Sequence, residues 1–217
     1  MNREEIRKQI RDIGLIPSIR VDSAATAIFA AENVAAGGRP IVEIAATIPD
    51  YEQVIRDLTN QYPALIVGGE VLFGLDQAGR VLDAGAMFLT GPGFAQQITK
   101  FCVEREIVVI PGALTPTEVM LAYEAGADFV KVFPCADVGG ERYIRALKAP
   151  LPHVPLIAAG GVNQSTAGHF IHAGAVALGV GEDLIPRQAL RFKEGAWIQE
   201  LAARFIDFVR KARVEME

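Results

Sequence analysis

The sequence contains few of the features that mark secreted, metal-binding or membrane proteins. Its 217 residues include only two cysteines, Cys102 and Cys135, which form neither a CxxC pair nor a zinc-binding spacing. Such cysteine usage favours a reducing compartment. No apolar run approaches the roughly 18 residues of a membrane span, and the charged N-terminus has no signal-peptide core. We therefore expect a cytoplasmic protein that does not bind membranes.

A strong charge of either sign is also missing. The net charge is −5, which does not favour nucleic acid or an anionic membrane as a partner. His169 and His172 share one face of a predicted helix, but no third ligand is in view, and we expect that face to be solvated rather than to hold a metal. The first predicted strand lacks a GxGxxG fingerprint, which argues against a dinucleotide-binding fold.

Short apolar runs and amphipathic stretches alternate along the whole chain. Strands are predicted over residues 15–20, 40–47, 64–69, 86–90, 106–112, 128–134, 154–161 and 175–181. Helical patterns such as 23–38, 50–62 and 115–127 lie between them. Strands that alternate with helices predict a parallel sheet, and strands that are apolar throughout predict a sheet covered on both faces.

Eight such units without a linker favour one domain. We predict a single (β/α)8 TIM barrel over residues 1–217, with an N-terminal helix. An open, doubly wound sheet is the alternative, but it would require fewer strands or an antiparallel edge.

The sixth predicted strand carries a lysine inside the apolar run "FVKVFP", residues 129–134. Because side chains alternate along a strand, Lys131 shares a face with Phe129 and Phe133. If the valines between them pack under helices, Lys131 points into the barrel. Glu43 has an inward position in the second predicted strand, and Arg20 ends the first. These three charged groups are therefore expected to converge.

A buried structural ion pair is one reading of Lys131 and Glu43, although such pairs gain little over apolar packing. The other reading is catalytic. Burial between phenylalanines favours the neutral amine of Lys131, which can attack a ketone and form a Schiff base. Glu43 would then transfer protons as a general acid and base.

Glycines end the seventh and eighth predicted strands. Gly160 and Gly161 lie in "AAGGVNQ", and Gly181 lies in "GVGEDLIP", which is predicted to open a short helix. In barrel enzymes, the loops after these two strands commonly bind phosphate through backbone N–H groups. The alternative is that the glycines serve only tight turns.

Four stretches resemble the 2-keto-3-deoxy-6-phosphogluconate (KDPG) / 4-hydroxy-2-oxoglutarate (KHG) aldolase family. They are "VEIAATIPD" (42–50), "PGALTPTEV" (111–119), "FVKVFPCADVGG" (129–140) and "AAGGVNQ" (158–164). The similarity covers nearly the whole chain. It implies a class I aldolase, a carbon–carbon lyase on a (β/α)8 barrel, that cleaves a 2-keto acid of this type to pyruvate and an aldehyde. It also implies a homotrimer that needs no metal or other cofactor.

The resemblance also implies roles for single residues. Lys131 matches the Schiff-base lysine and Glu43 the general acid/base. Arg20 looks like the carboxylate-binding arginine, because Thr47 stands where one branch of the family has that arginine. Substrate-binding positions are also expected at Pro92, Phe133, Gly160, Gly161 and Gly181.

Three positions depart from the family pattern. Glu70 stands where a substrate-contacting threonine is expected, Ala159 replaces a threonine near the phosphate, and Glu182 follows the eighth strand. If Glu70 and Glu182 both face inward, a phosphorylated substrate is disfavoured. The alternatives are therefore an altered or unphosphorylated aldehyde, a phosphate-binding isomerase in which Lys131 polarises the substrate, or an inactive barrel used for binding.

Overall fold

The computed structural model describes residues 1–38 and 41–216, so Pro40, where the second predicted strand begins, and Glu217 lie outside the described residues. Nine strands lie within the described part of the chain, and all printed pairings between them are parallel. They are β1 (Leu15–Ile19), β2 (Ile41–Ile44), β3 (Ile66–Glu70), β4 (Phe88–Thr90), β5 (Val108–Ile110), β6 (Gly112–Ala113), β7 (Val130–Val132), β8 (Leu156–Ala159) and β9 (Ala177–Val180). Every predicted strand overlaps an observed one.

The fifth predicted strand is divided in two at Pro111. Its first part, β5, pairs with β4, and its second part, β6, pairs with β7. Proline has no N–H to donate to a sheet, which accounts for a break at this position. The sheet order is β5-β4-β3-β2-β1-β9-β8-β7-β6. The two strands at its ends, β5 and β6, therefore belong to one continuous segment of the chain, which closes the barrel. The predicted eight-unit TIM barrel is confirmed, with one interrupted strand.

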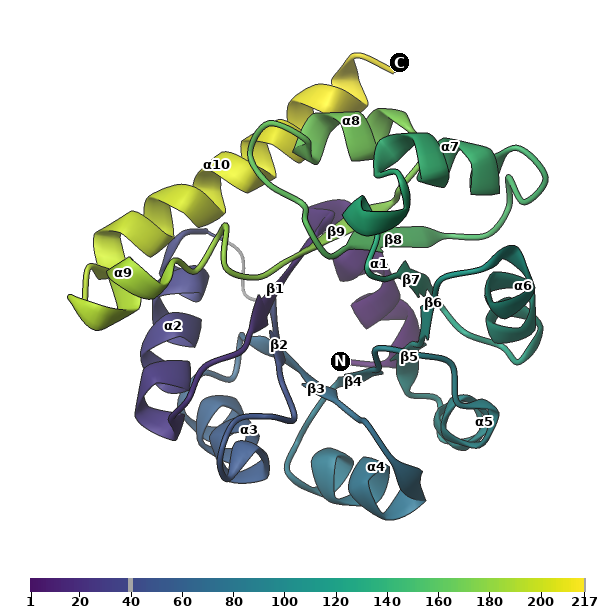
Figure 1. Ribbon diagram of the computed structural model, residues 1–217. Helices are drawn as coiled ribbons and strands as arrows, with labels where there is room; N and C mark the ends of the chain where they lie inside the picture. The colour runs from purple at the N-terminus through teal and green to yellow at the C-terminus, as the bar shows by residue number, and fades with distance from the viewer. Residues whose placement is uncertain (39–40, 217) are drawn as a thin grey trace.

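Helices surround the strands, as Figure 1 shows in a view along the barrel. The outer elements are α2 (Ala24–Ala36), α3 (Tyr51–Gln61), α4 (Gly74–Asp83), α5 (Gln96–Glu104), α6 (Pro116–Glu124), α7 (Glu141–Lys148), α8 (Ala167–His172), α9 (Arg187–Arg191) and α10 (Gly195–Val214). The N-terminal helix α1 (Arg3–Ile13) instead crosses one end of the barrel. Within the described ranges, no helix combines the length and the apolar character that crossing a membrane would require.

Two arginines fix α1 to the rest of the molecule. Nε of Arg3 donates to Asp128 at 3.0 Å, and the buried Asp128 carboxylate also accepts the N–H of Val109 at 2.9 Å. At the other end of α1, Arg213 from α10 donates to the carbonyl of Asp12 at 2.9 Å and to that of Val176 at 2.8 Å. The first and last helices of the chain are thereby joined at the barrel end.

The barrel interior is filled by side chains from alternate positions. A Cβ at Gly68 would lie 2.2 Å from the ring of Phe88, whereas a Cβ at Gly69 would meet Val81 of α4 at 2.3 Å. Gly68 therefore faces the interior and Gly69 faces the helices. The same alternation directs Glu70 inward at the end of β3. Its neighbour in the register is Thr90 of β4.

Candidate active site

Lys131 and Glu43 meet inside the barrel. Nζ of Lys131, from β7, lies 3.4 Å from Oε2 of Glu43, from β2. The two residues are 88 positions apart in the chain, and only 8% and 4% of their surfaces are exposed. A lysine and a glutamate are rarely buried this far without a partner or a use. The structure thus brings together the two residues that the sequence analysis placed at the centre of the chemistry.

The apolar residues around Lys131 differ in their exposure. Val130 and Val132 are fully buried on the opposite face of β7, and Phe129 lies buried beneath the guanidinium of Arg11, 5.4 Å from its ring centroid. Phe133 is 38% exposed. Lys131 therefore follows a buried phenylalanine on the α1 side of the barrel and precedes one that is partly exposed.

Two hydroxyl groups face the Glu43 carboxylate. Ser18 of β1 donates to its Oε1 at 2.7 Å, and Thr90 lies near the same carboxylate. Burial raises the pKa of Glu43, but the charge of Lys131 and the hydrogen bonds from Ser18, Thr90 and Lys131 outweigh burial, so the pKa lies below its ordinary value. Glu43 is therefore a carboxylate at neutral pH and can accept a proton.

The Thr90 contact is the weaker of the two. Its hydroxyl is buried and forms no well-aligned hydrogen bond with any residue of the described chain. Neither Ser18 nor Thr90 was predicted from the sequence, because each reads as one small polar residue in a short apolar strand. The available signal for Ser18 was the alternation of side chains along a strand, because Ser18 lies two positions before Arg20 and therefore on the same face. In the structure it lies opposite Glu43 in the register.

Arg20 is held by a carboxylate of the protein itself. Its Nη2 donates to both oxygens of Glu70, at 2.8 and 2.9 Å, and its Nη1 donates to Oγ1 of Thr47 at 2.9 Å. Glu70 is 2% exposed and also accepts the N–H of Ala46 at 3.1 Å. Half of the Arg20 side chain remains exposed. The arginine expected to bind a substrate carboxylate is thus already hydrogen-bonded to the carboxylate of Glu70.

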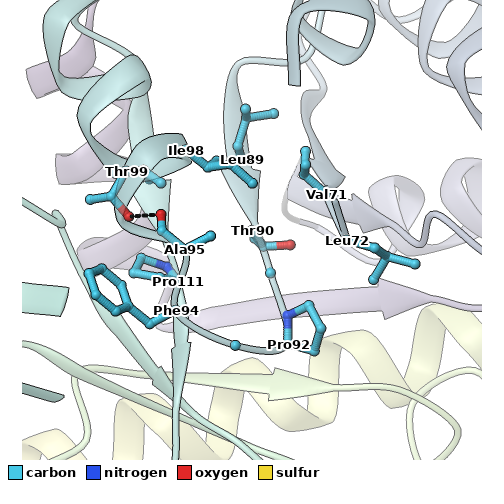
Figure 2. Close-up of a pocket in the computed structure, with 13 residues that line it drawn as sticks. Val71, Leu72, Leu89, Thr90, Pro92, Phe94, Ala95, Ile98, Thr99 and Pro111 are labelled. Carbon is cyan, nitrogen blue, oxygen red and sulfur yellow. Dashed lines mark hydrogen bonds between the residues drawn. The ribbon is translucent and has the colours of Figure 1, made fainter. Parts of the chain in front are cut away.

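A cavity of about 210 Å³ lies between the ends of β3 and β4 and helix α5. In Figure 2, Thr90 and Pro92 lie between Val71 and Leu72 on one side and Ala95 and Ile98 on the other. Lys131 and Glu43 do not line this cavity, and Thr90 joins the cavity to their site. Pro92, expected to contact substrate, lines this cavity.

The glycine loops after β8 and β9 adopt different conformations. Gly160 and Gly161 have φ angles of 83° and 75°, and a Cβ at Gly161 would lie 2.3 Å from Cβ of Ala136. These two glycines are required by the close approach of the loop that follows β7. Gly181 begins a turn, its carbonyl accepting from Leu184 at 3.0 Å, whereas helix α9 begins only at Arg187. The prediction that "GVGEDLIP" opens a helix directly is wrong because Pro186 separates the turn from α9.

Glu182 faces solvent. Its side chain is 64% exposed and lies 3.2 Å from Nε of Arg187, which is itself 86% exposed. Of the two glutamates that depart from the family pattern, only Glu70 points into the barrel. Ala159, the third departure, is buried at the end of β8.

A lysine and a carboxylate buried together inside a parallel (β/α)8 barrel are the groups that a lysine-dependent aldolase requires. Residues 6–201 match the family model of KDPG and KHG aldolases, and the chain belongs to this family. It is therefore a class I aldolase, a carbon–carbon lyase.

Individual relatives agree with this assignment. The 2-dehydro-3-deoxy-6-phosphogalactonate aldolase of Escherichia coli K12 is 31% identical over 93% of this chain and 94% of its own length. The KHG/KDPG aldolase of the same organism is 28% identical over 89% and 91%. A KDPG aldolase structure from Legionella pneumophila, with pyruvate captured as a covalent carbinolamine, superposes with a TM-score of 0.82 at 25% identity, covering 91% and 96% of the two chains.

Proposed function

We propose that Lys131 is the Schiff-base residue and Glu43 the proton-transfer residue of an aldolase that releases pyruvate from a 4-hydroxy-2-oxo acid. The observation that carries the proposal is the 3.4 Å approach of Nζ of Lys131 to Oε2 of Glu43 in a buried interior. An ion pair at this position also places a base beside the amine that must lose a proton before it can attack a carbonyl.

The reaction follows from these two groups. The neutral amine of Lys131 attacks C2 of the 2-oxo acid, and the carbinolamine loses water to give an iminium ion. Removal of the C4 hydroxyl proton breaks the C3–C4 bond, releases the aldehyde, and leaves the electron pair in an enamine. Protonation of C3 gives the pyruvate iminium ion, which water hydrolyses to pyruvate and free lysine. Glu43 can carry the protons in these steps because it is ionised and adjacent to Nζ.

The remaining predicted residues have supporting roles in this proposal. Half of the Arg20 side chain is exposed, so the N–H groups that Glu70 and Thr47 do not occupy would be open to a polar group of the substrate. Backbone N–H groups beside Gly160, Gly161 and Gly181 would bind the far end of the substrate. The outward orientation of Glu182 supports this, since its charge is compensated by Arg187. KDPG, its galactonate counterpart and KHG are the candidate substrates, because the relatives named above act on them.

We also propose a homo-oligomer, a trimer by resemblance to the family. Three apolar side chains on α6 support a contact between copies: Met120, Leu121 and Tyr123 are 46%, 48% and 37% exposed. Neighbouring exposed apolar groups of this kind often mark interfaces.

The decisive experiment is reductive trapping. Pyruvate and sodium borohydride are added to the protein, and the modified peptide is identified by mass spectrometry. The expected result is a reduced pyruvate adduct on Lys131 that is absent from Lys131→Ala. An adduct on Lys100 or Lys148 would contradict the assignment, and no adduct on any lysine would favour the isomerase or binding-barrel alternatives.

A further inference from the structure

The carboxylate of Glu70 is bound to Arg20, and the proposed catalytic pair of Lys131 and Glu43 does not use this contact. Both oxygens of Glu70 lie within 2.9 Å of Nη2, and Thr47 takes one N–H of Nη1. A guanidinium grips a carboxylate best through two parallel N–H bonds, from Nε and Nη2 or from Nη1 and Nη2. Both arrangements use Nη2. Because Glu70 takes at least one of the two Nη2 N–H groups, at least one of the two edges of Arg20 is occupied by a carboxylate of the protein.

The charge balance at the entrance changes in the same direction. Lys131 and Glu43 form one neutral pair, and Arg20 and Glu70 form another, at the ends of β1 and β3, which lie on either side of β2. The Glu70 charge is fixed in place, since it is 2% exposed and also accepts the N–H of Ala46. A ligand carboxylate therefore meets the neutral Arg20–Glu70 pair. The positive charge that Arg20 alone would present to the ligand is offset by Glu70.

We propose that Glu70 is a specificity-determining residue that makes the site indifferent to the substrate's carboxylate. The site would then accept 2-oxo compounds in which a neutral polar group, such as an amide, replaces the carboxylate. This inference rests on the proposed Schiff-base function of Lys131, and it concerns only which carbonyl compounds reach that lysine.

The test compares pyruvate with pyruvamide, which has the same size and shape but no charge. The dissociation constant of each is measured from the concentration dependence of borohydride trapping, on wild-type protein and on Glu70→Gln. Glutamine keeps the length of the side chain and an oxygen that can accept from Nη2 and from Ala46, while it removes the negative charge. Glu182→Gln is the matched control, because it makes the same change in an ion pair that is exposed.

In wild type the two ligands should bind within about 10-fold of each other. In Glu70→Gln, pyruvate should bind about 10- to 100-fold more tightly, the range of one charge-assisted hydrogen bond, while pyruvamide changes by less than about 3-fold. In the double variant Arg20→Ala/Glu70→Gln this gain should vanish, because Glu70 acts through Arg20. Glu182→Gln should leave both ligands unchanged.

Other results overturn the inference. They include a wild-type preference for pyruvate above about 10-fold, which needs no variant to detect, and a Glu70→Gln variant that changes both ligands equally or weakens pyruvate. In either case trapping on Lys131 would still support the proposed function. If neither ligand is trapped on Lys131 in wild type, the proposed function itself fails, and the two failures are thereby distinguished.

Discussion

The hydroxyl of Ser18 donates a 2.7 Å hydrogen bond to Oε1 of Glu43, the oxygen that does not face Lys131. The carboxylate is thus held from two strands, with one oxygen on a neutral donor and the other on the amine. This arrangement orients Glu43 and stabilises its ionised form.

Ser18→Ala should move the acid limb of the pH–rate profile to higher pH. Removal of the Ser18 hydrogen bond takes away one of the contacts that lower the pKa of Glu43, so the carboxyl protonates earlier as the pH falls. The measurement is kcat/KM for aldol cleavage as a function of pH, with Ser18→Thr as the variant that keeps a hydroxyl. An unchanged acid limb in Ser18→Ala would show that Ser18 only fills space.

Glu43→Gln should lower kcat by about 10²–10⁴-fold, the usual contribution of a general acid and base. The amide is close in size to the carboxylate and can still accept from Ser18, so the melting temperature should change little. Steady-state rates and thermal melting check this together. A rate near that of wild type would exclude Glu43 as the proton carrier.

Asp128→Ala should destabilise the protein by about 3 kcal/mol, because it removes a buried carboxylate and leaves Arg3 and the N–H of Val109 without their partner. Denaturant unfolding measures the loss. Asp12→Ala is the control, since the Asp12 side chain is 52% exposed and pairs with Lys8 on the same helix surface. It should cost less than about 0.5 kcal/mol. Equal losses would mean that Asp128 does not fasten α1.

Neither cysteine should react with a thiol reagent at pH 8 in the native protein. Burial, with a smaller contribution from Asp128, raises the pKa of Cys102 to about 12, and burial raises that of Cys135 to about 12, with a smaller contribution from Glu141. The thiolate is the reactive form. Absorbance after addition of a disulfide reagent should show both thiols only once denaturant is present, and rapid labelling of native protein would contradict their burial.

Light scattering at micromolar concentration should give a multiple of the 23.3 kDa chain mass, with three copies expected. Leu121→Glu places a charge among the exposed apolar residues of α6 and should favour dissociation if that helix forms the contact. A monomer mass for wild type would refute the proposed oligomer.

The sequence predicted what depends on local periodicity. Alternation within the strands placed Lys131 and Glu43 on inward faces, and the barrel rule then made them converge. The division of the fifth strand at Pro111 had a local signal too, because proline lacks the N–H that the sheet requires. It was missed because the apolar run continues through it.

The contacts of Arg20 had no such local signal. Arg20 and Glu70 are 50 positions apart and lie on strands that are not adjacent, so their pairing depends on the curvature of the closed sheet. Thr90 of β4 reaches Glu43 for the same reason, whereas Ser18 lies opposite Glu43 on the adjacent strand β1. Whether Glu182 turned inward was equally undecidable from sequence, since its direction is set by Arg187 in the next helix.

The hydrogen bond from Arg213 to the carbonyl of Asp12 joins α10 to α1 across 201 positions of the sequence. During synthesis on the ribosome, α1 is complete long before Arg213 is made. We therefore expect the barrel end beneath α1 to stay open until α10 has been synthesised. A nascent chain truncated before α10 should accordingly be far more sensitive to protease at Gly14, the residue against which Arg213 packs.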